Sequence, residues 1–534
     1  MTSPDPIVAR EVRRRRTFAI ISHPDAGKTT LTEQLLLIGG AVREAGAVRA
    51  RKAQRHATSD WLEIERQRGI SVSSSVMHFE HEGIRVNILD TPGHRDFSED
   101  TYRTLVAADS AVMLIDAAKG IEDQTRKLFE VCRLRGIPIF TFVNKLDREG
   151  RDPLALLDEI EEVLGIDAVP ASWPVGAGSE FQGVYDRIGE RLLLFTPDAD
   201  RELPGPVDAP ELRSAMGRHA DEVCEALALL EGAGSGLDPT AIRGGEQTPV
   251  FFGSALRGKG VASFLERFLE LAPCPGPRAS DRGPIAPAEH PFSGFVFKIQ
   301  ANLDPDHRDR AAFVRVCSGR FVRGETALHV PSGTRIRLAR STLFQARDRE
   351  EVDEAWPGDV VGLFDPGIFR IGDTLSAEGG FAFEPLPAFS PERFARVELG
   401  AISGRKAFAK GLEQLTQEGL VQRFHEPGGG LDTVLGAMGE LQFDVLRHRM
   451  RSEYRVELPL SPLPYELARW PAGPLDPDLF RWSEGVKILE DRDGRPVLLF
   501  RSRWELEQTE RKHPELQLSP IPPDDPLADA TAGR

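Results

Sequence analysis

Residues 17–30 read TFAIISHPDAGKTT, and this stretch decides the fold of the first part of the chain. The apolar run Thr17–Ile21 is typical of a buried strand, and Leu31, Leu35 and Ile38 follow at the spacing of one helix face. The pattern therefore predicts a strand, a short loop and a helix in succession.

The loop between this strand and this helix has the composition of a phosphate-binding loop. Backbone N–H groups at a helix N-terminus bind phosphate, a lysine there reaches the terminal phosphate oxygens, and the adjacent hydroxyl holds magnesium. The first glycine that such loops usually carry is a serine here. The residues expected to wrap the phosphates are Ser22, His23, Pro24, Asp25, Ala26, Gly27, Lys28 and Thr29, with Thr29 as a magnesium ligand.

Three later apolar runs predict further strands of the same sheet. Arg85–Asp90, Ala111–Asp116 and Ile137–Asn144 are separated by helical patterns. This alternation predicts a mostly parallel sheet that is covered by helices on both faces. Ligands bind beyond the carboxyl ends of the strands in such sheets, so these ends form the expected binding edge.

A second polar motif follows the strand that ends at Asp90. An aspartate at this place holds magnesium through water in P-loop nucleotide hydrolases, and Gly93 allows its amide to approach a terminal phosphate closely. The residues predicted to contact or sense the phosphates are Asp90, Thr91, Pro92, Gly93 and His94.

A third polar motif, Asn144, Lys145 and Asp147, follows the strand that ends at Asn144. A carboxylate accepts two N–H donors from guanine, an arrangement that adenine cannot offer. The motif therefore predicts a site for GTP or GDP, and it disfavours a metabolic P-loop kinase that uses ATP.

Composition narrows the class of protein further. Of the 534 residues, 40% are hydrophobic and 28% are charged, which is an ordinary globular balance. The net charge of −16 disfavours generic DNA or RNA coating. Cys132, Cys224, Cys274 and Cys317 are too widely spaced for a zinc knuckle or a disulfide framework. No apolar run approaches the ~18 residues of a membrane span, so we expect a soluble protein without a membrane partner. We also expect a cytoplasmic monomer without a DNA partner.

The set of motifs resembles the translational GTPases, and within them the family of bacterial peptide chain release factor 3, which is related to elongation factor G. The segments that carry the resemblance are SHPDAGKTTLTE (22–33), ERQRGISV (65–72), LDTPGHRDFSEDTYRTL (89–105), FVNKLDREGRDP (142–153), FVFKIQANLDPDHRDRAAF (295–313) and GAMGELQFDVL (436–446). They extend over almost the whole chain, and those within the first 150 residues are the most specific.

This resemblance implies roles for further residues. Ser71 matches the switch residue that completes magnesium coordination when the terminal phosphate is present, although many relatives carry threonine there. His94 matches the residue that orients the attacking water. Ser254 and Ala255, with Leu256, would supply a backbone donor to the guanine carbonyl, and the role of Asp25 stays open.

The expected architecture has three domains. A GTP-binding α/β P-loop domain with a mostly parallel sheet occupies residues 1–280 and carries an insertion at about 148–250. Short strand patterns between turn signals predict an antiparallel β-barrel over 281–387. An α+β domain follows over 388–534 and ends in a frayed tail from about residue 520.

The function that the resemblance implies is that of a ribosome-stimulated GTPase that promotes dissociation and recycling of class I peptide chain release factors at translation termination. Its partners would be the ribosome and those release factors, with GTP, GDP and magnesium at the site. Two alternatives stay open: a ribosomal GTPase like elongation factor G that acts in translocation or ribosome protection, and a GTP-binding scaffold that does not hydrolyse. The basic run Arg447–Arg451 predicts either an RNA contact or a solvated helix face.

Overall fold

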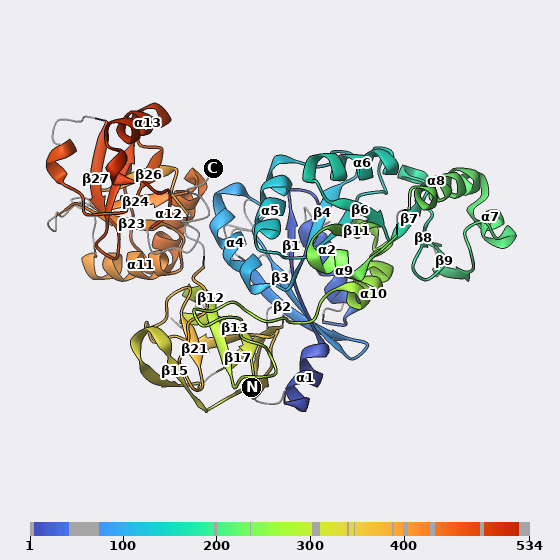
Figure 1. Cartoon of the computed structure of the whole chain (residues 1–534), viewed down its shortest axis with the longest axis horizontal. Helices are drawn as coiled ribbons and strands as arrows, with labels where there is room; N and C mark the ends of the chain where they lie inside the picture. The colour runs from blue at the N-terminus through green and yellow to red at the C-terminus, as the bar shows by residue number, and fades with distance from the viewer. Residues whose placement is uncertain are drawn as a thin grey trace.

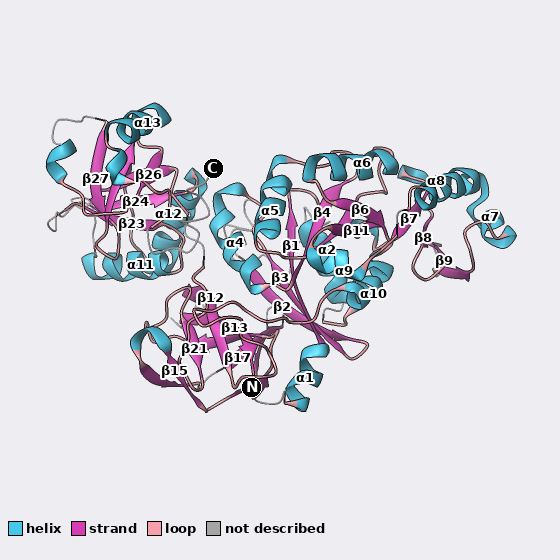
Figure 2. Cartoon of the chain, viewed as in Figure 1, coloured by secondary structure: helices cyan, strands magenta, loops and turns pink. Residues whose placement is uncertain are grey.

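The computed structural model describes residues 5–41, 74–196, 200–234, 236–301, 310–338, 341–345, 348–386, 389–398, 404–427, 433–480 and 485–522. Figure 1 shows three regions along the chain: an N-terminal region with a lateral extension, a barrel region below it, and a C-terminal region beside both. Figure 2 shows that helices flank the sheets of the first and last regions, whereas the middle region consists almost entirely of strands.

The N-terminal region is built on a sheet with the strand order β2-β3-β1-β4-β5-β11-β6. Its neighbouring strands are parallel except for β2, which is antiparallel to β3. The strands are β1 (Arg15–Ser22), β2 (Ser75–His81), β3 (Ile84–Asp90), β4 (Ser110–Asp116), β5 (Ile139–Asn144), β6 (Asp167–Pro170) and β11 (Gln247–Phe252). The predicted mostly parallel α/β sheet is confirmed.

Helices cover both faces of this sheet because successive side chains of its strands point to opposite sides. Along β1, Ala19 and Ile21 pack into one core, and Phe18 and Ile20 pack into the other. The first core receives α4 (Ser98–Ala107), α5 (Asp123–Leu134) and α6 (Pro153–Leu164). The second receives α2 (Lys28–Ile38), α9 (Pro239–Gly244) and α10 (Val261–Leu271).

The predicted insertion is narrower than residues 148–250. Strand β6 belongs to the main sheet, where it pairs in parallel with β11, and helix α6 packs against that sheet. The lateral extension has its own sheet of the order β10-β9-β8-β7. Its elements are β7 (Ser172–Val175), β8 (Gly183–Asp186), β9 (Arg191–Leu194), β10 (Arg201–Pro204), α7 (Pro210–Met216) and α8 (Ala220–Gly232). The β6 segment was missed because four residues ending in proline give almost no periodic signal.

The middle region is an antiparallel barrel-type sheet of the order β16-β15-β21-β12-β13-β20-β17-β18. Long β12 (Ser293–Ala301) and β13 (Arg310–Ser318) form its centre, and Val296, Val314 and Val361 lie in its core. The other strands of this sheet are β15 (Thr326–His329), β16 (Thr334–Arg337), β17 (Ser341–Gln345), β18 (Asp348–Glu351), β20 (Val360–Phe364) and β21 (Thr374–Ser376). Two short strands, β14 (Phe321–Val322) and β19 (Glu354–Ala355), pair with each other in a separate two-stranded sheet. The structure confirms the predicted fold class of this region, an antiparallel β-structure of the barrel type.

The C-terminal region is an α+β unit with the strand order β25-β22-β24-β23-β27-β28-β26. The strands are β22 (Arg393–Val397), β23 (Gln422–His425), β24 (Thr433–Ala437), β25 (Leu460–Leu463), β26 (Leu467–Arg469), β27 (Val486–Glu490) and β28 (Pro496–Phe500). The helices are α11 (Arg405–Gln417), α12 (Glu440–Tyr454) and α13 (Arg503–Lys512). Ser519 pairs with Trp470 and Ile521 is buried, so packed chain continues to residue 521. The rest of the predicted tail lies outside the described residues, and the domain boundaries at 280 and 387 stay predictions.

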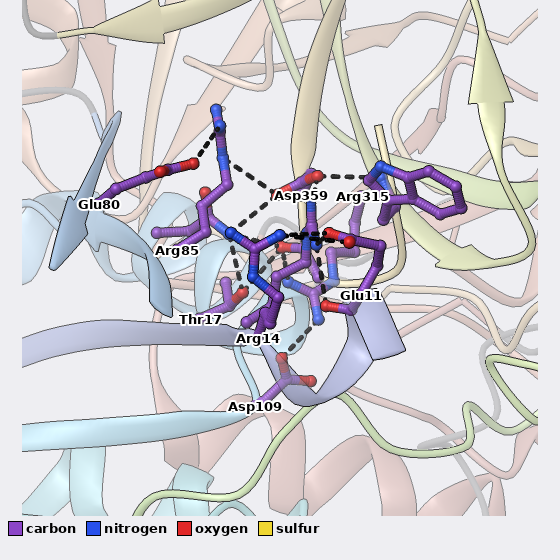
Figure 3. A network of polar contacts seen from close by, with 12 residues as sticks. Glu11, Arg14, Thr17, Glu80, Arg85, Asp109, Arg315 and Asp359 are labelled. Atoms are coloured by element: carbon purple, nitrogen blue, oxygen red, sulfur yellow. Dashed lines mark hydrogen bonds and ion pairs between the residues drawn. The ribbon is translucent and has the colours of Figure 1, made fainter. Parts of the chain in front are cut away.

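A buried polar network joins the N-terminal region to the barrel at the amino ends of β1 and β3 (Figure 3). Arg15, which follows α1 (Pro6–Arg13), donates to Asp359 at 2.9 Å and to Glu11 at 2.8 Å. Arg85 lies 3.5 Å from Asp359, and Arg315 from the barrel pairs with Asp109 at 2.5 Å. Asp359 and Arg315 are each only 1% exposed, so each charge is held by its oppositely charged protein partners rather than by water.

Among the residues that the structure describes, no helix has both the length and the apolar character needed to cross a membrane.

Candidate nucleotide-binding site

The loop between β1 and α2 has the backbone geometry of a phosphate cradle. Asp25 and Gly27 adopt positive φ angles of 66° and 103°. A Cβ at Gly27 would overlap Asn144 Nδ2, so only glycine fits this position. No side chain of the residues that the structure describes caps the N-terminus of α2, which leaves its backbone N–H groups to a ligand.

The other residues of this loop lie around the cradle. His23 and Pro24 are half-buried, Asp25 is exposed, and Ala26 is buried. Among the described residues, the buried hydroxyl of Ser22 has no hydrogen-bond partner, and His23 Nε2 lies 3.3 Å from Glu122. An unpartnered buried hydroxyl costs stability unless a ligand satisfies it. The loop therefore fits a polar ligand rather than a purely structural turn.

The structure brings the first and second motifs together. Strands β1 and β3 are parallel neighbours in which Ile20 is level with Asp90. As a result, the Lys28 ammonium lies 2.5 Å from Asp90 Oδ1, with both side chains buried. An ammonium and a carboxylate at one loop edge are the groups that phosphate and a divalent cation would engage.

The segment after Asp90 returns toward the first loop. Thr91 donates to the Ile20 carbonyl at 2.6 Å, Pro92 is buried, and the Cβ position of Gly93 is 3.7 Å from Pro24. The side chain of His94 is 36% exposed, and its Nδ1 accepts the Asp96 N–H at 3.2 Å. His94 therefore stands at the rim of the site with its Nδ1 held by a backbone N–H.

The third motif is tied directly to the first. Asn144 donates to the Ala26 carbonyl at 2.8 Å and accepts the Ala255 N–H at 2.8 Å. Lys145, with φ 70°, donates to the Asp25 carbonyl, and the hydroxyl of Ser254 donates to Asp147 at 2.5 Å. Three segments that are distant in sequence thus meet at the carboxyl edge of the sheet. The Ala255 amide holds Asn144 in place, a use that the sequence did not predict.

Sequence reasoning missed Asp116 as part of this site. Asp116 ends β4 and accepts from Lys145 Nζ at 2.7 Å and from the Ala118 N–H at 2.9 Å. Burial alone would raise its pKa, but the hydrogen bond from Lys145 and the nearby positive charges hold the pKa below its ordinary value. The signal that could have found it is the carboxylate at the carboxyl end of a central strand.

The donor set of the site fits magnesium rather than a metal that requires a dense protein cage. Among the described residues, no group of three or more His, Cys, Asp and Glu side chains has the geometry of a metal site. Mg²⁺ at phosphates takes one or two protein oxygens and completes its shell with phosphate and water. Half-buried Thr29 at the start of α2 and buried Asp90 offer this kind of donor. The further predicted ligand, Ser71, lies outside the described residues.

Family models match the chain in three consecutive parts. Residues 13–274 match the Elongation factor Tu GTP binding domain, residues 291–378 match Elongation factor G domain 2, and residues 383–510 match the Class II release factor RF3, C-terminal domain. The first match contains the three motifs described above.

Similar proteins cover nearly the whole chain. Peptide chain release factor 3 of Symbiobacterium thermophilum is 57% identical over 519 residues, which is 95% of this chain and 98% of that protein. Peptide chain release factor 3 of Gloeobacter violaceus is 53% identical over 532 residues, which is 97% of this chain and 99% of that protein. The crystal structure of ttk003000868 from Thermus thermophilus has a TM-score of 0.68 and 25% identity, and covers 91% of this chain and 72% of that chain.

Proposed function

The chain belongs to the family of peptide chain release factor 3 and contains the GTP-binding domain of translational GTPases, and from this premise we propose that it is a ribosome-stimulated GTPase. It would promote dissociation and recycling of class I peptide chain release factors during translation termination, with GTP hydrolysis driving a switch between two states. The observation that carries the proposal is the meeting of Lys28, Asp90 and Asn144 at one sheet edge, in a chain that also has this family's C-terminal domain.

The contacts support specific roles for the phosphate-binding residues. Lys28 would neutralise charge on the terminal phosphates, and the N–H groups of residues 25–29 would wrap them, because α2 begins without a side-chain cap. Thr29, Asp90 and Ser71 would hold Mg²⁺, which neutralises charge on the phosphate oxygens when bound. The Gly93 amide would sense the terminal phosphate, since this residue packs against Pro24 in the first loop.

Guanine recognition would rest on the third motif. The Asp147 carboxylate accepts from Ser254 at 2.5 Å and is fixed in position, so it could accept two N–H groups from the guanine edge. Asn144 would keep the first and third motifs in register through its bond to Ala26. Lys145 would cover the base plane, because its ammonium is held by Asp25 and Asp116.

His94 would orient the attacking water. Its Nδ1 accepts a backbone N–H, so its Nε2 is the nitrogen left to contact water near the terminal phosphate. Phosphoryl transfer to water depends on positioning and charge neutralisation more than on covalent help. A partner that aligns His94 would therefore raise the rate, which is the role proposed for the ribosome.

The experiment compares wild type and His94→Ala in GTP turnover, alone and with ribosomes that are stalled at a stop codon with a class I release factor bound. We expect His94→Ala to lower the stimulated rate by at least about 100-fold while GTP binding is retained. His290→Ala, which removes an exposed histidine far from the motifs, is the matched control. Wild type that shows no increase with ribosomes would refute the proposal.

Two further measurements on the same proteins, release-factor recycling and turnover with elongating ribosomes, separate the alternatives. A scaffold that does not hydrolyse predicts that His94→Ala recycles release factors normally. A factor like elongation factor G is favoured by the match of residues 291–378 to domain 2 of that factor. It predicts stimulation by elongating ribosomes without dependence on a bound release factor. The match of residues 383–510 to the release factor domain is the observation against it.

A further inference from the structure

We propose that Asp96 is a positioning residue that couples the placement of the C-terminal region to the orientation of His94. The inference rests on the role proposed above for His94 and adds to it the path by which a partner of the C-terminal region would reach the nucleotide site. Asp96 itself lies in η2 (Arg95–Phe97), between the second motif, which ends at His94, and α4.

The first half of the coupling is the contact between Asp96 and His94. Asp96 donates its backbone N–H to His94 Nδ1 at 3.2 Å, and its Oδ1 lies 3.3 Å from the same nitrogen. The side chain of Asp96 is 8% exposed, so this contact is made away from bulk water. The rotation of the imidazole ring is therefore set by the position of residue 96.

The second half is a contact between Asp96 and the N-terminus of α12 in the C-terminal region. Asp96 Oδ2 accepts the Leu441 N–H at 3.0 Å, and a carboxylate is favoured at a helix N-terminus by the helix dipole. Gly439, the residue before α12, gives the carboxylate its space, because a Cβ there would overlap Asp96 Cγ. The Asp96 carboxylate thus holds residue 96 to α12, and the backbone N–H of the same residue holds His94.

Apolar packing reinforces the same contact. Phe97, the next residue, is 3% exposed and packs with Val445 from α12 and with Leu441 and Leu420. Figure 1 shows α12 on the side of the C-terminal region that faces α4. Residues 94–97 are therefore clamped to the first turns of α12 by a charged bond and by a small hydrophobic cluster.

Helix α12 is in turn fixed to the barrel. Arg449, in its middle, is 5% exposed and pairs with Glu418 and Glu453, so the basic run Arg447–Arg451 is neither a wholly solvated face nor wholly available to RNA. Glu418 also accepts the Ala301 N–H from β12 at 2.6 Å. A displacement of the C-terminal region from the barrel would pull on α12, and the bond to Leu441 would transmit that displacement to Asp96 and His94.

The test uses the full-length chain with ribosomes and measures stimulated turnover, KM and nucleotide affinity. We expect Asp96→Ala to lower the stimulated kcat by about 10- to 100-fold, since misplacing a reacting group by about 1 Å costs that much, while KM and GDP affinity stay the same. Asp96→Asn keeps an oxygen for the Leu441 N–H and should recover part of the rate.

Gly439→Ala tests the coupling from the other side. Its φ of −154° suits alanine, so the variant changes only the space that Asp96 occupies. It should lower kcat as Asp96→Ala does, and the double variant should be no slower than Asp96→Ala alone, because both act through one contact. Asp444→Ala, at an exposed position of the same helix, is the control and should behave as wild type.

The outcomes distinguish this inference from the proposal beneath it. Normal stimulated turnover of Asp96→Ala beside slow turnover of His94→Ala overturns the coupling alone. Unchanged turnover of His94→Ala removes the proposed role of His94, and the coupling with it. Additive losses in the Asp96→Ala, Gly439→Ala double variant also overturn the coupling, because they show two independent structural defects.

Discussion

The two ends of the N-terminal sheet use buried charge in different ways. At the amino ends of β1 and β3, Arg15 and Arg85 meet Asp359, which lies in the turn before β20, so the partners come from two regions (Figure 3). At the carboxyl ends, Lys28, the first residue of α2, meets Asp90, the last residue of β3, and both belong to one region. The first arrangement is a permanent joint between regions, whereas the second presents charges to a ligand that is exchanged.

The hydrogen bonds of the polar atoms also differ between the two ends of the sheet. Asp359 accepts from Arg15 and from the Trp356 N–H, each at 2.9 Å, and Thr17 donates to the Gly358 carbonyl at 2.7 Å. In the nucleotide loop, by contrast, the described part of the chain offers the buried Ser22 hydroxyl no partner and α2 no side-chain cap. At the joint, too, Arg85 Nε and Nη2 and Arg315 Nε are buried without a hydrogen-bond partner among the described residues, so the open helix N-terminus at the carboxyl ends of the strands, rather than an unsatisfied buried atom, distinguishes the binding site.

The largest expected effect breaks the joint. Asp359→Ala removes the buried carboxylate that Arg15 and Arg85 share and leaves Arg15 with Glu11, and breaking a buried pair in this way costs about 3–5 kcal/mol of folding free energy. We expect this loss in urea or thermal unfolding, with nucleotide affinity of the folded protein unchanged because the site lies at the other end of β1. Glu354→Ala, which removes a half-exposed barrel carboxylate paired with Arg320, is the matched control and should cost little. A stable Asp359→Ala variant that binds GDP poorly would reverse the assignment of the two ends.

The sequence revealed the binding end of the sheet and missed the joint, and the reason is the range of the interactions. Lys28, Asp90 and Asn144 each end or follow an apolar strand, so a local pattern places them at one edge once the sheet is parallel. Arg15 and Asp359 are separated by 344 positions, and no local pattern pairs them. Asp116 was missed although its strand was predicted, because its side chain was not considered as part of the site.

The regions beyond the first sheet were predicted in class rather than in detail. Turn signals and short strands were sufficient for the antiparallel middle region, because alternation and turns are local features. The predicted bounds of the insertion, about 148–250, were too wide. Strand β6 has only four residues and pairs with a strand that follows it by about eighty positions, so no local pattern assigned it to the main sheet. The contact of Asp96 with α12 joins two regions and was beyond any sequence pattern.

The second prediction sharpens the binding end by changing only the base-recognising group. Asp147→Asn keeps an oxygen that accepts from Ser254 but replaces the other acceptor with an amide donor. We expect GTP and GDP affinity to fall by about 10- to 100-fold, which is about 1.4–2.8 kcal/mol, with unchanged stability. Titration with a fluorescent GDP analogue measures the change, and a xanthine nucleotide, which offers an acceptor where guanine has its amino group, should lose less or gain. Equal losses for both bases would show that Asp147 does not read the base edge.

The smallest effect is a difference in how the joint responds to acid. Burial alone would raise the pKa of Glu11, but Arg15, Arg14 and Arg10 hold it below its ordinary value of 4.5. A carboxylate whose pKa is lowered by folding contributes stability that is present above its unfolded pKa and is lost as the pH falls through its folded pKa. Glu11→Gln should therefore cost about 1 kcal/mol or less at pH 7, and the deficit relative to wild type should shrink only below about pH 4.5. Urea unfolding of both proteins between pH 7 and pH 3.5 measures this, and GDP affinity at pH 7 should be the same for both. A deficit that grows as the pH falls would mean that Glu11 is held protonated in the folded protein, and that the charges of the joint are balanced by Asp359 alone.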